Sequence, residues 1–173
     1  MMNNTAINNT TINLLPLDVC DRSWLRFDKK TLPKKICGKW ALYFNDKLLM
    51  NEVWKVAIKS LMEDKLYGVQ SLACSTNYVG KSGHSRICTI GTLTFACDVS
   101  PDEENEEIIM NVGKNILEIF NYDERQTVYY KSDQSTFIKK EFTIPTSTHY
   151  TYKLDNHLYI KKVENIMGDN DVH

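Results

Sequence analysis

The sequence has few of the features that mark a secreted, membrane-spanning or metal-binding protein. Its five cysteines are odd in number and widely spaced, with no Cys-x-x-Cys pair, which disfavours a disulfide framework and a zinc site and predicts small, buried, free thiols. No apolar stretch approaches the length of a membrane span, and the first residues lack the charged and then apolar pattern of a signal peptide. These absences predict an intracellular protein, cytoplasmic or nuclear, without a membrane or a cofactor.

A surplus of either charge is also missing. The 21 lysines and arginines nearly balance the 22 acidic residues, and the formal net charge is −1. Such a balance gives no general attraction to nucleic acid, so DNA is not indicated and any anion site must be local. A catalytic set is equally hard to find: Cys74 or Cys88 with His84 lacks a third orienting group, and we predict a non-catalytic protein without a metal site.

The sequence does contain enough apolar residues to form one hydrophobic core. The chain has 173 residues, 42% hydrophobic and 25% charged, which suits a single domain. Residues 1–13 are rich in Asn and Thr and are predicted to be a disordered leader, residues 14–167 the domain, and residues 168–173 a frayed tail. The apolar segment 14–27 is predicted to lie extended on the domain surface, anchored by Trp24.

Two amphipathic helices are predicted. In the first, Asn51 is the expected N-cap, and the apolar positions form one buried stripe: Val53, Trp54, Ala57, Ile58, Leu61 and Met62. In the second, Ser100 is the expected N-cap, with Pro101 in the first turn and Glu103 closing a capping box. Its expected core face comprises Ile109, Val112, Ile116, Ile119 and Phe120.

Short strands rich in β-branched and aromatic residues surround these helices. They are predicted at residues 40–44, 67–75, 87–90, 127–131, 136–144, 150–153 and 157–160, the last two as a hairpin. Helices falling between the strands of a mostly antiparallel sheet predict an α+β domain, with about seven or eight strands and two or three helices on one face.

A small basic loop between the second and third strands is the first candidate site. Lys81 and Arg86, with His84 between them and glycines at positions 80 and 83, place cations and free backbone amides in one turn, as phosphate oxygens require. The alternative is a solvated hairpin tip with ordinary turn glycines. Cys74 and Cys88 flank the loop and are expected to be cross-strand neighbours.

The second candidate lies at the end of the strand at residues 127–131. Lys131 would add a cation to a concave ligand face, and Tyr78, Tyr129 and Tyr130 would lie near it and stack on bases. The alternatives are a strand-end charge and half-buried sheet tyrosines.

Several motifs in order resemble the basophilic-leukaemia-expressed family of uncharacterised eukaryotic proteins, over roughly residues 24 to 142. They are Trp24-Leu-Arg-Phe27-Asp28, Gly38-Lys39-Trp40, Val53-Trp54 with Ile58, Arg86-Ile-Cys-Thr after the loop, and Tyr130-Lys131-Ser-Asp133. That family shares the fold of translation initiation factor 4E, which binds the mRNA cap between two tryptophans and docks a protein partner through a helix. The present chain has three tryptophans and no Trp-Glu pair.

The resemblance implies a single initiation factor 4E-like domain that binds a nucleotide-like or RNA phosphate ligand on the concave face of its sheet, without catalysis. The implied ligand residues are Lys81, His84, Arg86, Lys131, Tyr78 and Tyr130. One alternative is a protein-interaction module that docks a partner through the helix carrying Trp54. A third reading is a nucleotide phosphoesterase, for which the sequence offers no catalytic set. Because the two-tryptophan sandwich is missing, we expect no preference for methylguanine.

Overall fold

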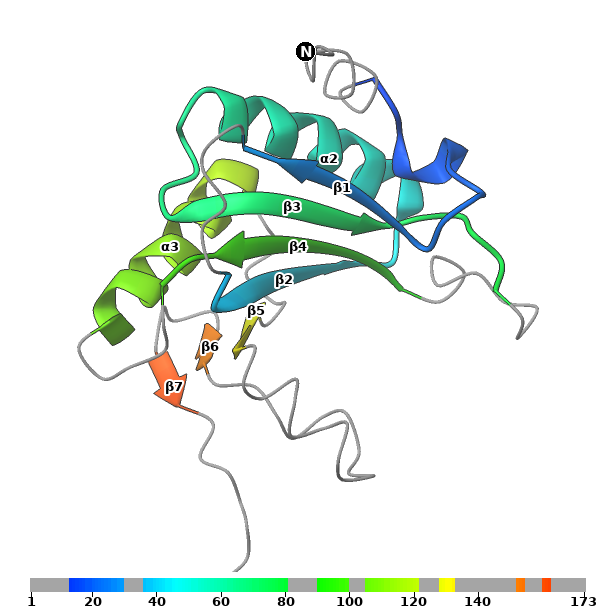
Figure 1. The fold of residues 1–173 in the computed structure, drawn as a ribbon. Helices are drawn as coiled ribbons and strands as arrows, with labels where there is room; N and C mark the ends of the chain where they lie inside the picture. The colour runs from blue at the N-terminus through cyan, green and yellow to red at the C-terminus, as the bar shows by residue number, and fades with distance from the viewer. Residues whose placement is uncertain are drawn as a thin grey trace, which may run out of the picture.

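The computed structural model describes residues 13–29, 36–80, 90–99, 105–121, 128–132, 152–154 and 160–162 (Figure 1). Along the chain the elements are η1 (Pro16–Asp18), β1 (Trp24–Asp28), β2 (Gly38–Phe44), α2 (Lys47–Met62), β3 (Val69–Ser75), β4 (Gly91–Cys97), α3 (Glu106–Phe120), β5 (Val128–Ser132), β6 (Tyr152–Leu154) and β7 (Ile160–Lys162).

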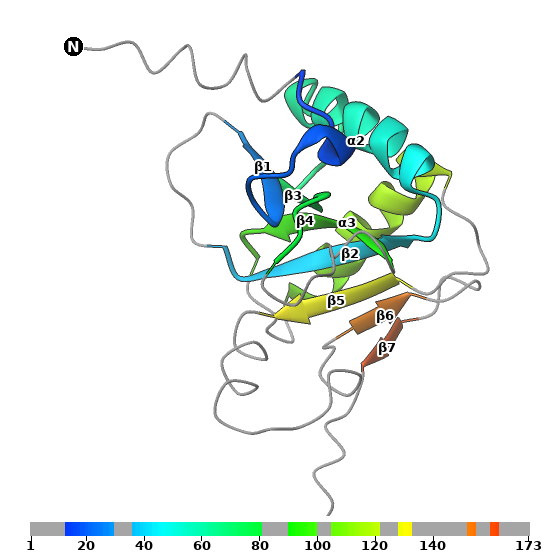
Figure 2. The same cartoon turned by 90° about the vertical axis from the view of Figure 1, so that its right-hand side faces the viewer.

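The strands form one sheet in the order β1-β3-β4-β2-β5-β6-β7, and every neighbouring pair is antiparallel. Five of the strands have five to seven residues, whereas β6 and β7 have three each. Figures 1 and 2 show α2 and α3 on the same side of the sheet. The predicted one-sided α+β layer is therefore confirmed. The strand expected at 136–144 lies outside the described residues.

The two faces of the sheet follow from the alternation of side chains along each strand. In β2, Trp40, Leu42 and Phe44 are buried, whereas Tyr43 between them is only half-buried. The Trp40 indole N–H donates a hydrogen bond to the carbonyl of Ile109 in α3, with an N···O distance of 3.1 Å. The core thus lies between the sheet and the two helices.

Helix α2 begins earlier than the sequence predicts. Its N-cap is Asp46, whose carboxylate accepts hydrogen bonds from the backbone N–H groups of Leu48 and Leu49. The predicted cap at Asn51 is wrong, because Asn51 lies inside the helix and is buried. The Asp46 carboxylate satisfies the free amides at the true start of the helix, five residues before Asn51. The predicted stripe is buried at Trp54, Ala57, Ile58 and Leu61, but Met62 at the helix end is exposed.

Helix α3 begins at Glu106, after Asn105 as N-cap, and the latter makes no side-chain capping bond. Pro101 and Glu103, predicted for the first turn, and Ser100, the predicted cap, lie outside the described residues. The predicted core face is confirmed: Ile109, Val112 and Ile116 are buried, and Ile119 and Phe120 pack against the core while partly buried.

The segment around Trp24 is a strand of the sheet and not an extended surface segment. β1 pairs with β3 along its whole length, with Leu25 opposite Cys74 and Phe27 opposite Leu72. Leu25 and Phe27 enter the core, whereas Trp24 is half-buried. The prediction failed because the alternation is short and Arg26 interrupts the apolar run.

The described cysteines are free, but they do not share one environment. Cys74 and Cys97 are buried, and burial raises the pKa of each thiol to about 12. Cys20 is exposed, contrary to the prediction of uniformly buried thiols. Cys74 lies opposite Leu93 in the ladder with β4, so the expected cross-strand pairing with Cys88 is wrong.

Candidate functional site

The face of the sheet opposite the helices, called the open face below, carries a pair of lysines. Lys39 of β2 and Lys131 of β5 lie directly opposite each other in the antiparallel ladder. Both alternate with buried residues, Lys39 with Trp40 and Lys131 with Tyr130, so both belong to the open face. Directly opposed Cβ atoms lie roughly 5 Å apart. The sheet therefore brings two positive charges to one point, and we call these two residues the lysine pair.

The open face beside the lysine pair is made of small and aromatic side chains. One row of the ladder runs across the five long strands through Arg26, Ala73, Thr94, Ala41 and Tyr129. The backbone register continues that row to Lys153 in β6 and Lys161 in β7. A flat ring could approach the small residues closely, with Tyr129 next to the lysine pair for stacking.

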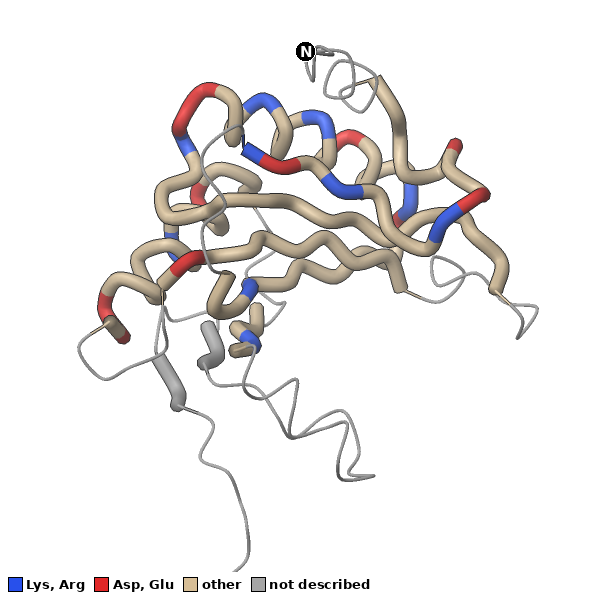
Figure 3. The backbone as a smooth tube through the Cα atoms, in the orientation of Figure 1, with Lys and Arg blue, Asp and Glu red and all other residues tan. Residues whose placement is uncertain are grey.

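Charge is confined to the margins of this face. The residues of β3 and β4 include no Asp, Glu, Lys or Arg. In Figure 3 both strands are tan along their whole length, and blue segments lie on the neighbouring β2 and β5. The β1 edge carries both Arg26 and Asp28, which are exposed on this face, so an anion would be attracted to the β2–β5 side.

Tyr130 does not face the open side, contrary to its predicted role in ligand binding. It is fully buried, and its ring packs against Trp40 with ring centroids 5.4 Å apart. Its hydroxyl donates to the carbonyl oxygen of Val99 at 3.3 Å. The preceding residue, Tyr129, is half-buried on the open face and takes the position expected for Tyr130.

The predicted basic loop lies outside the described residues, and so do Lys81, His84 and Arg86. The described chain reaches Gly80 and resumes at Ile90, just before β4. Gly91 at the start of β4 lies opposite Phe44 at the end of β2, whereas Ala96 lies opposite Lys39. The strand ends next to the loop are thus five residues from the row of the lysine pair, or about 17 Å at the rise of a β-strand.

Tyr78 lies on the way into that loop. Its side chain is half-buried, and its backbone N–H donates to Thr76 Oγ1 at 3.4 Å. Tyr78 therefore lies at the end of β3 from which the loop leaves in the sequence, whereas Lys131 lies near the other end of the sheet strands. The predicted site combined Tyr78 and Lys131, whereas the sheet places them towards opposite ends of its strands.

Trp54, the predicted docking residue, is fully buried, and its indole N–H donates to the carbonyl oxygen of Leu14 at 3.1 Å. The outer side of α2 instead exposes other apolar residues: Leu48 at 71%, Leu49 at 53% and Val56 at 46% of their surface. Charged residues lie among them, including Glu52 and Lys55, whose side chains form an ion pair at 2.7 Å.

Two observations concern metal and thiol chemistry in the described part of the chain, which does not include His84 or Cys88. The described residues contain no cluster of three potential His, Cys, Asp or Glu metal ligands. Cys74, considered as a nucleophile, has a raised pKa and is buried, so little reactive thiolate forms at neutral pH. None of the described helices is long and apolar enough to span a membrane.

Comparison with solved structures identifies the fold. The chain is similar to C. elegans eIF4E-3, solved in complex with the 4E-binding protein Mextli and a cap analogue, with a TM-score of 0.55, 8% identity, and 78% of this chain and 76% of that chain covered. It is also similar to schistosome eIF4E, solved with m7GpppG and 4E-BP, with a TM-score of 0.57, 14% identity, and 86% and 79% covered. No protein-family model matches the sequence, and no curated protein matches it.

These similarities show the predicted initiation factor 4E-like fold and nothing finer. The site residue that sequence reasoning missed is Lys39. The signal was present in Gly38-Lys39-Trp40-Ala41, where alternation places Lys39 opposite the core face. Lys131 was predicted as a ligand residue, but its pairing with Lys39 follows only from the register between β2 and β5, which the sequence does not give.

Proposed function

We propose that the open face binds a phosphate-bearing ligand, a nucleotide or an RNA strand, without catalysis. The observation that carries this proposal is the lysine pair: two cations opposite each other, beside Tyr129 and a floor of small uncharged side chains. Two ammonium groups at one point would attract phosphate oxygens, and an aromatic ring beside them would stack on a base. The solved neighbours were crystallised with a cap analogue and with m7GpppG.

The separation of the two predicted cation groups favours an elongated ligand. Lys81, His84 and Arg86 lie outside the described residues and remain predicted phosphate contacts; β4, which follows them in the sequence, begins at Gly91, five residues from the row of the lysine pair. A single nucleotide would not reach across about 17 Å of strand. A dinucleotide polyphosphate or a short RNA strand would, and we therefore propose RNA as the preferred ligand class.

Methylguanine recognition by two tryptophans is not expected. All three tryptophans fall in the described residues; Trp40 and Trp54 are fully buried, and only Trp24 is partly accessible. A sandwich of a methylated base needs two accessible rings, and stacking on indoles is what favours the positively charged base. We propose that the chain binds m7GTP no better than GTP. A preference of tenfold or more, about 1.4 kcal/mol, would contradict this.

The test is calorimetric titration of short RNA oligomers, GTP and m7GTP into the wild type and matched variants. The double variant Lys39→Gln with Lys131→Gln is expected to weaken RNA binding at least tenfold, because charge-assisted contacts are worth about 1.5–3 kcal/mol each. Arg26→Gln removes one charge from the far edge of the same face and is the control. Equal affinity of wild type and lysine double variant would remove the lysine pair from the site.

A second pair of variants tests the loop. Lys81→Ala with Arg86→Ala is expected to weaken RNA binding and to flatten its salt dependence, since fewer counterions are released. If only this pair matters, the ligand binds at the loop end alone. If both double variants weaken RNA binding and only one of them weakens GTP binding, the RNA ligand spans the open face.

Protein docking through α2 is the second proposed function, and the exposed Leu48, Leu49 and Val56 favour it. Leu49 and Val56 are seven residues apart, on the same side of the helix, as an amphipathic partner helix would require. The probe is a 4E-BP peptide, because the schistosome neighbour was solved with that protein. Leu49→Glu with Val56→Glu should abolish binding of the peptide without loss of RNA binding. We also propose, on the sequence motifs given above, that the chain belongs to the basophilic-leukaemia-expressed family.

A further inference from the structure

The segment that precedes β1 connects α2 to the turn after β3. At α2, the Trp54 indole N–H donates to the Leu14 carbonyl, and the Leu17 backbone N–H donates to Asn51 Oδ1 at 3.3 Å. Figures 1 and 2 show the short helix η1 beside α2. Pro16 is buried in this contact, and Leu14 and Leu17 pack on the core. We call residues 14–23 the strap.

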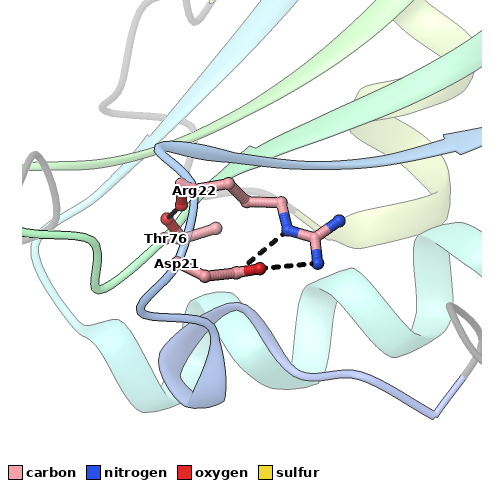
Figure 4. A network of polar contacts seen from close by, with 3 residues as sticks. All are labelled: Asp21, Arg22 and Thr76. Atoms are coloured by element: carbon pink, nitrogen blue, oxygen red, sulfur yellow. Dashed lines mark hydrogen bonds and ion pairs between the residues drawn. The ribbon is translucent and has the colours of Figure 1, made fainter.

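The other side of the strap holds the turn that leaves β3. The backbone N–H of Asn77 donates to the Pro16 carbonyl at 3.3 Å, and that of Thr76 donates to the Ser23 carbonyl at 3.3 Å. The Thr76 hydroxyl donates to the Arg22 carbonyl, as Figure 4 shows. The strap therefore contacts α2 and the turn within a few residues of each other.

Buried polar atoms on both sides depend on the strap. Asn51 and Thr76 are 6% and 0% exposed, and the polar side-chain atom of each bonds to the strap backbone. A buried polar group that loses its partner pays its full desolvation cost. Opening of the strap would therefore remove the Leu17 donor from Asn51 Oδ1 and the Arg22 acceptor from the Thr76 hydroxyl, whose oxygen would keep its bond from the Tyr78 N–H.

The exposed part of the strap is held locally. Asp21 and Arg22 form a bidentate pair, with Arg22 Nη2 2.9 Å from Asp21 Oδ2, seen beside Thr76 in Figure 4. The Arg22 guanidinium lowers the pKa of the Asp21 carboxyl through their hydrogen bond. This pair is exposed and links two neighbouring residues, so it does not by itself join the strap to α2 or to the turn.

We propose that the strap makes α2 and the turn at residues 76–78 one cooperative unit, and so positions Tyr78, a predicted ligand residue whose N–H donates to Thr76 Oγ1. Thr76, Asn77 and Asn51 are positioning residues in this unit. Release of the strap from α2 loosens the turn, and release of the turn loosens the strap. Only the consequence for ligand binding rests on the proposed function; the cooperative unit does not.

Hydrogen exchange of the wild-type chain tests the unit without a variant. The amides of Leu17, Thr76 and Asn77 each donate across the contact, so they should open with one common free energy and one common denaturant dependence. Exchange of the Thr76 and Asn77 amides in a separate, more easily opened unit would overturn the proposal.

Variants test the direction of the coupling. Asn51→Ala should raise exchange at least tenfold at Leu17 and also at Asn77, although the hydrogen bond that it removes is to Leu17 in the strap. Thr76→Val should do the same in reverse, because coupling between two sites is reciprocal. Lys55→Ala, on the exposed side of α2, should change neither amide. An effect of Asn51→Ala confined to residues 14–19 would overturn the coupling.

RNA affinity then separates the two proposals. If the strap positions the turn that carries Tyr78, Asn51→Ala should weaken binding of a short RNA about threefold or more, and Lys55→Ala should not. Wild-type affinity in Asn51→Ala, with exchange still coupled, would overturn the positioning role. If the wild type binds no RNA, the proposed function fails, and the exchange experiment still decides whether the unit exists.

Discussion

Tyr129 and Tyr130 are neighbours in β5, yet they belong to different parts of the molecule. Tyr130 is fully buried, packs on Trp40 and bonds to the Val99 carbonyl, whereas Tyr129 lies half-buried on the open face beside the lysine pair. Residue type is the same in both, and only the strand alternation differs. An aromatic residue in a strand is therefore assigned to the core or to a ligand by its face, before its chemistry is considered.

The helix side and the open face of the sheet also differ in the hydrogen bonds of their polar atoms. On the helix side, the three largest buried side chains each bond a backbone carbonyl: Trp40 to Ile109, Trp54 to Leu14 and Tyr130 to Val99. Each carbonyl lies outside the sheet strands, so these bonds tie other segments to the core. On the open face, the lysine pair and Tyr129 are half-buried. Stability resides on one face and the proposed binding on the other.

The largest expected effect comes from the inner side of α2. Trp54→Ala should reduce the free energy of unfolding by about 3–5 kcal/mol, because it removes a fully buried indole and its bond to Leu14. Leu48→Ala, at a residue 71% exposed, should change it by less than about 0.5 kcal/mol. Chemical denaturation measures both. A small loss for Trp54→Ala would place the indole outside the core and return it to a docking role.

Gly38 sharpens the comparison at the start of β2. A Cβ built there would lie 2.2 Å from the Tyr130 hydroxyl oxygen and 2.8 Å from the Lys131 backbone carbonyl oxygen. Gly38→Ala should therefore cost about 1–3 kcal/mol through overpacking. Gly80→Ala is the control, since among the described residues its Cβ would meet only Tyr78, at 3.7 Å. Urea denaturation of the two variants should separate them; equal stability would mean that Tyr130 can move aside.

Much of the fold was accessible from the sequence because its periodic signals were strong. The three- and four-residue spacing of Ile109, Val112 and Ile116 gave the core face of α3, and the hairpin near the C-terminus appears as β6 and β7. Helix caps were less predictable, because Asp46 and Asn51 are both good caps and only the start of the apolar stripe distinguishes them.

The candidate site was less accessible because it depends on register. Lys39 and Lys131 are far apart in the sequence and meet only because β5 pairs with β2. The separation of Lys131 from the loop end has the same origin, since antiparallel pairing sends the loop to the opposite end of the strands. Both Tyr129 and Tyr130 were predicted near the site, and Tyr130 was assigned to the ligand. The two differ by one position, and in a strand one position reverses the face of the sheet.

A smaller effect should distinguish the two tyrosines themselves. Tyr130→Phe removes the bond to the Val99 carbonyl and should cost about 1 kcal/mol, since one hydrogen bond is lost and a carbonyl is left buried. Tyr129→Phe should cost less than half of this, because its ring is half-buried on the open face. Thermal denaturation of both variants is the measurement. Equal losses would show that the two faces are not as different as their burial indicates.

The smallest expected effect concerns the charge on the open face. Like charges directly opposite each other in a sheet are destabilising, so Lys39→Gln should raise the free energy of unfolding by about 0.2–1 kcal/mol at low salt. Arg26→Gln removes a positive charge opposite Ala73 and should give no such gain. The difference should disappear near 1 M salt, where the screening length falls to about 3 Å. A gain in stability accompanied by weaker RNA binding would mean that the lysine pair costs stability and is retained for a ligand. No gain at low salt would mean that the charges of the pair are already balanced within the fold, and the case for an anionic ligand would then depend on the loop.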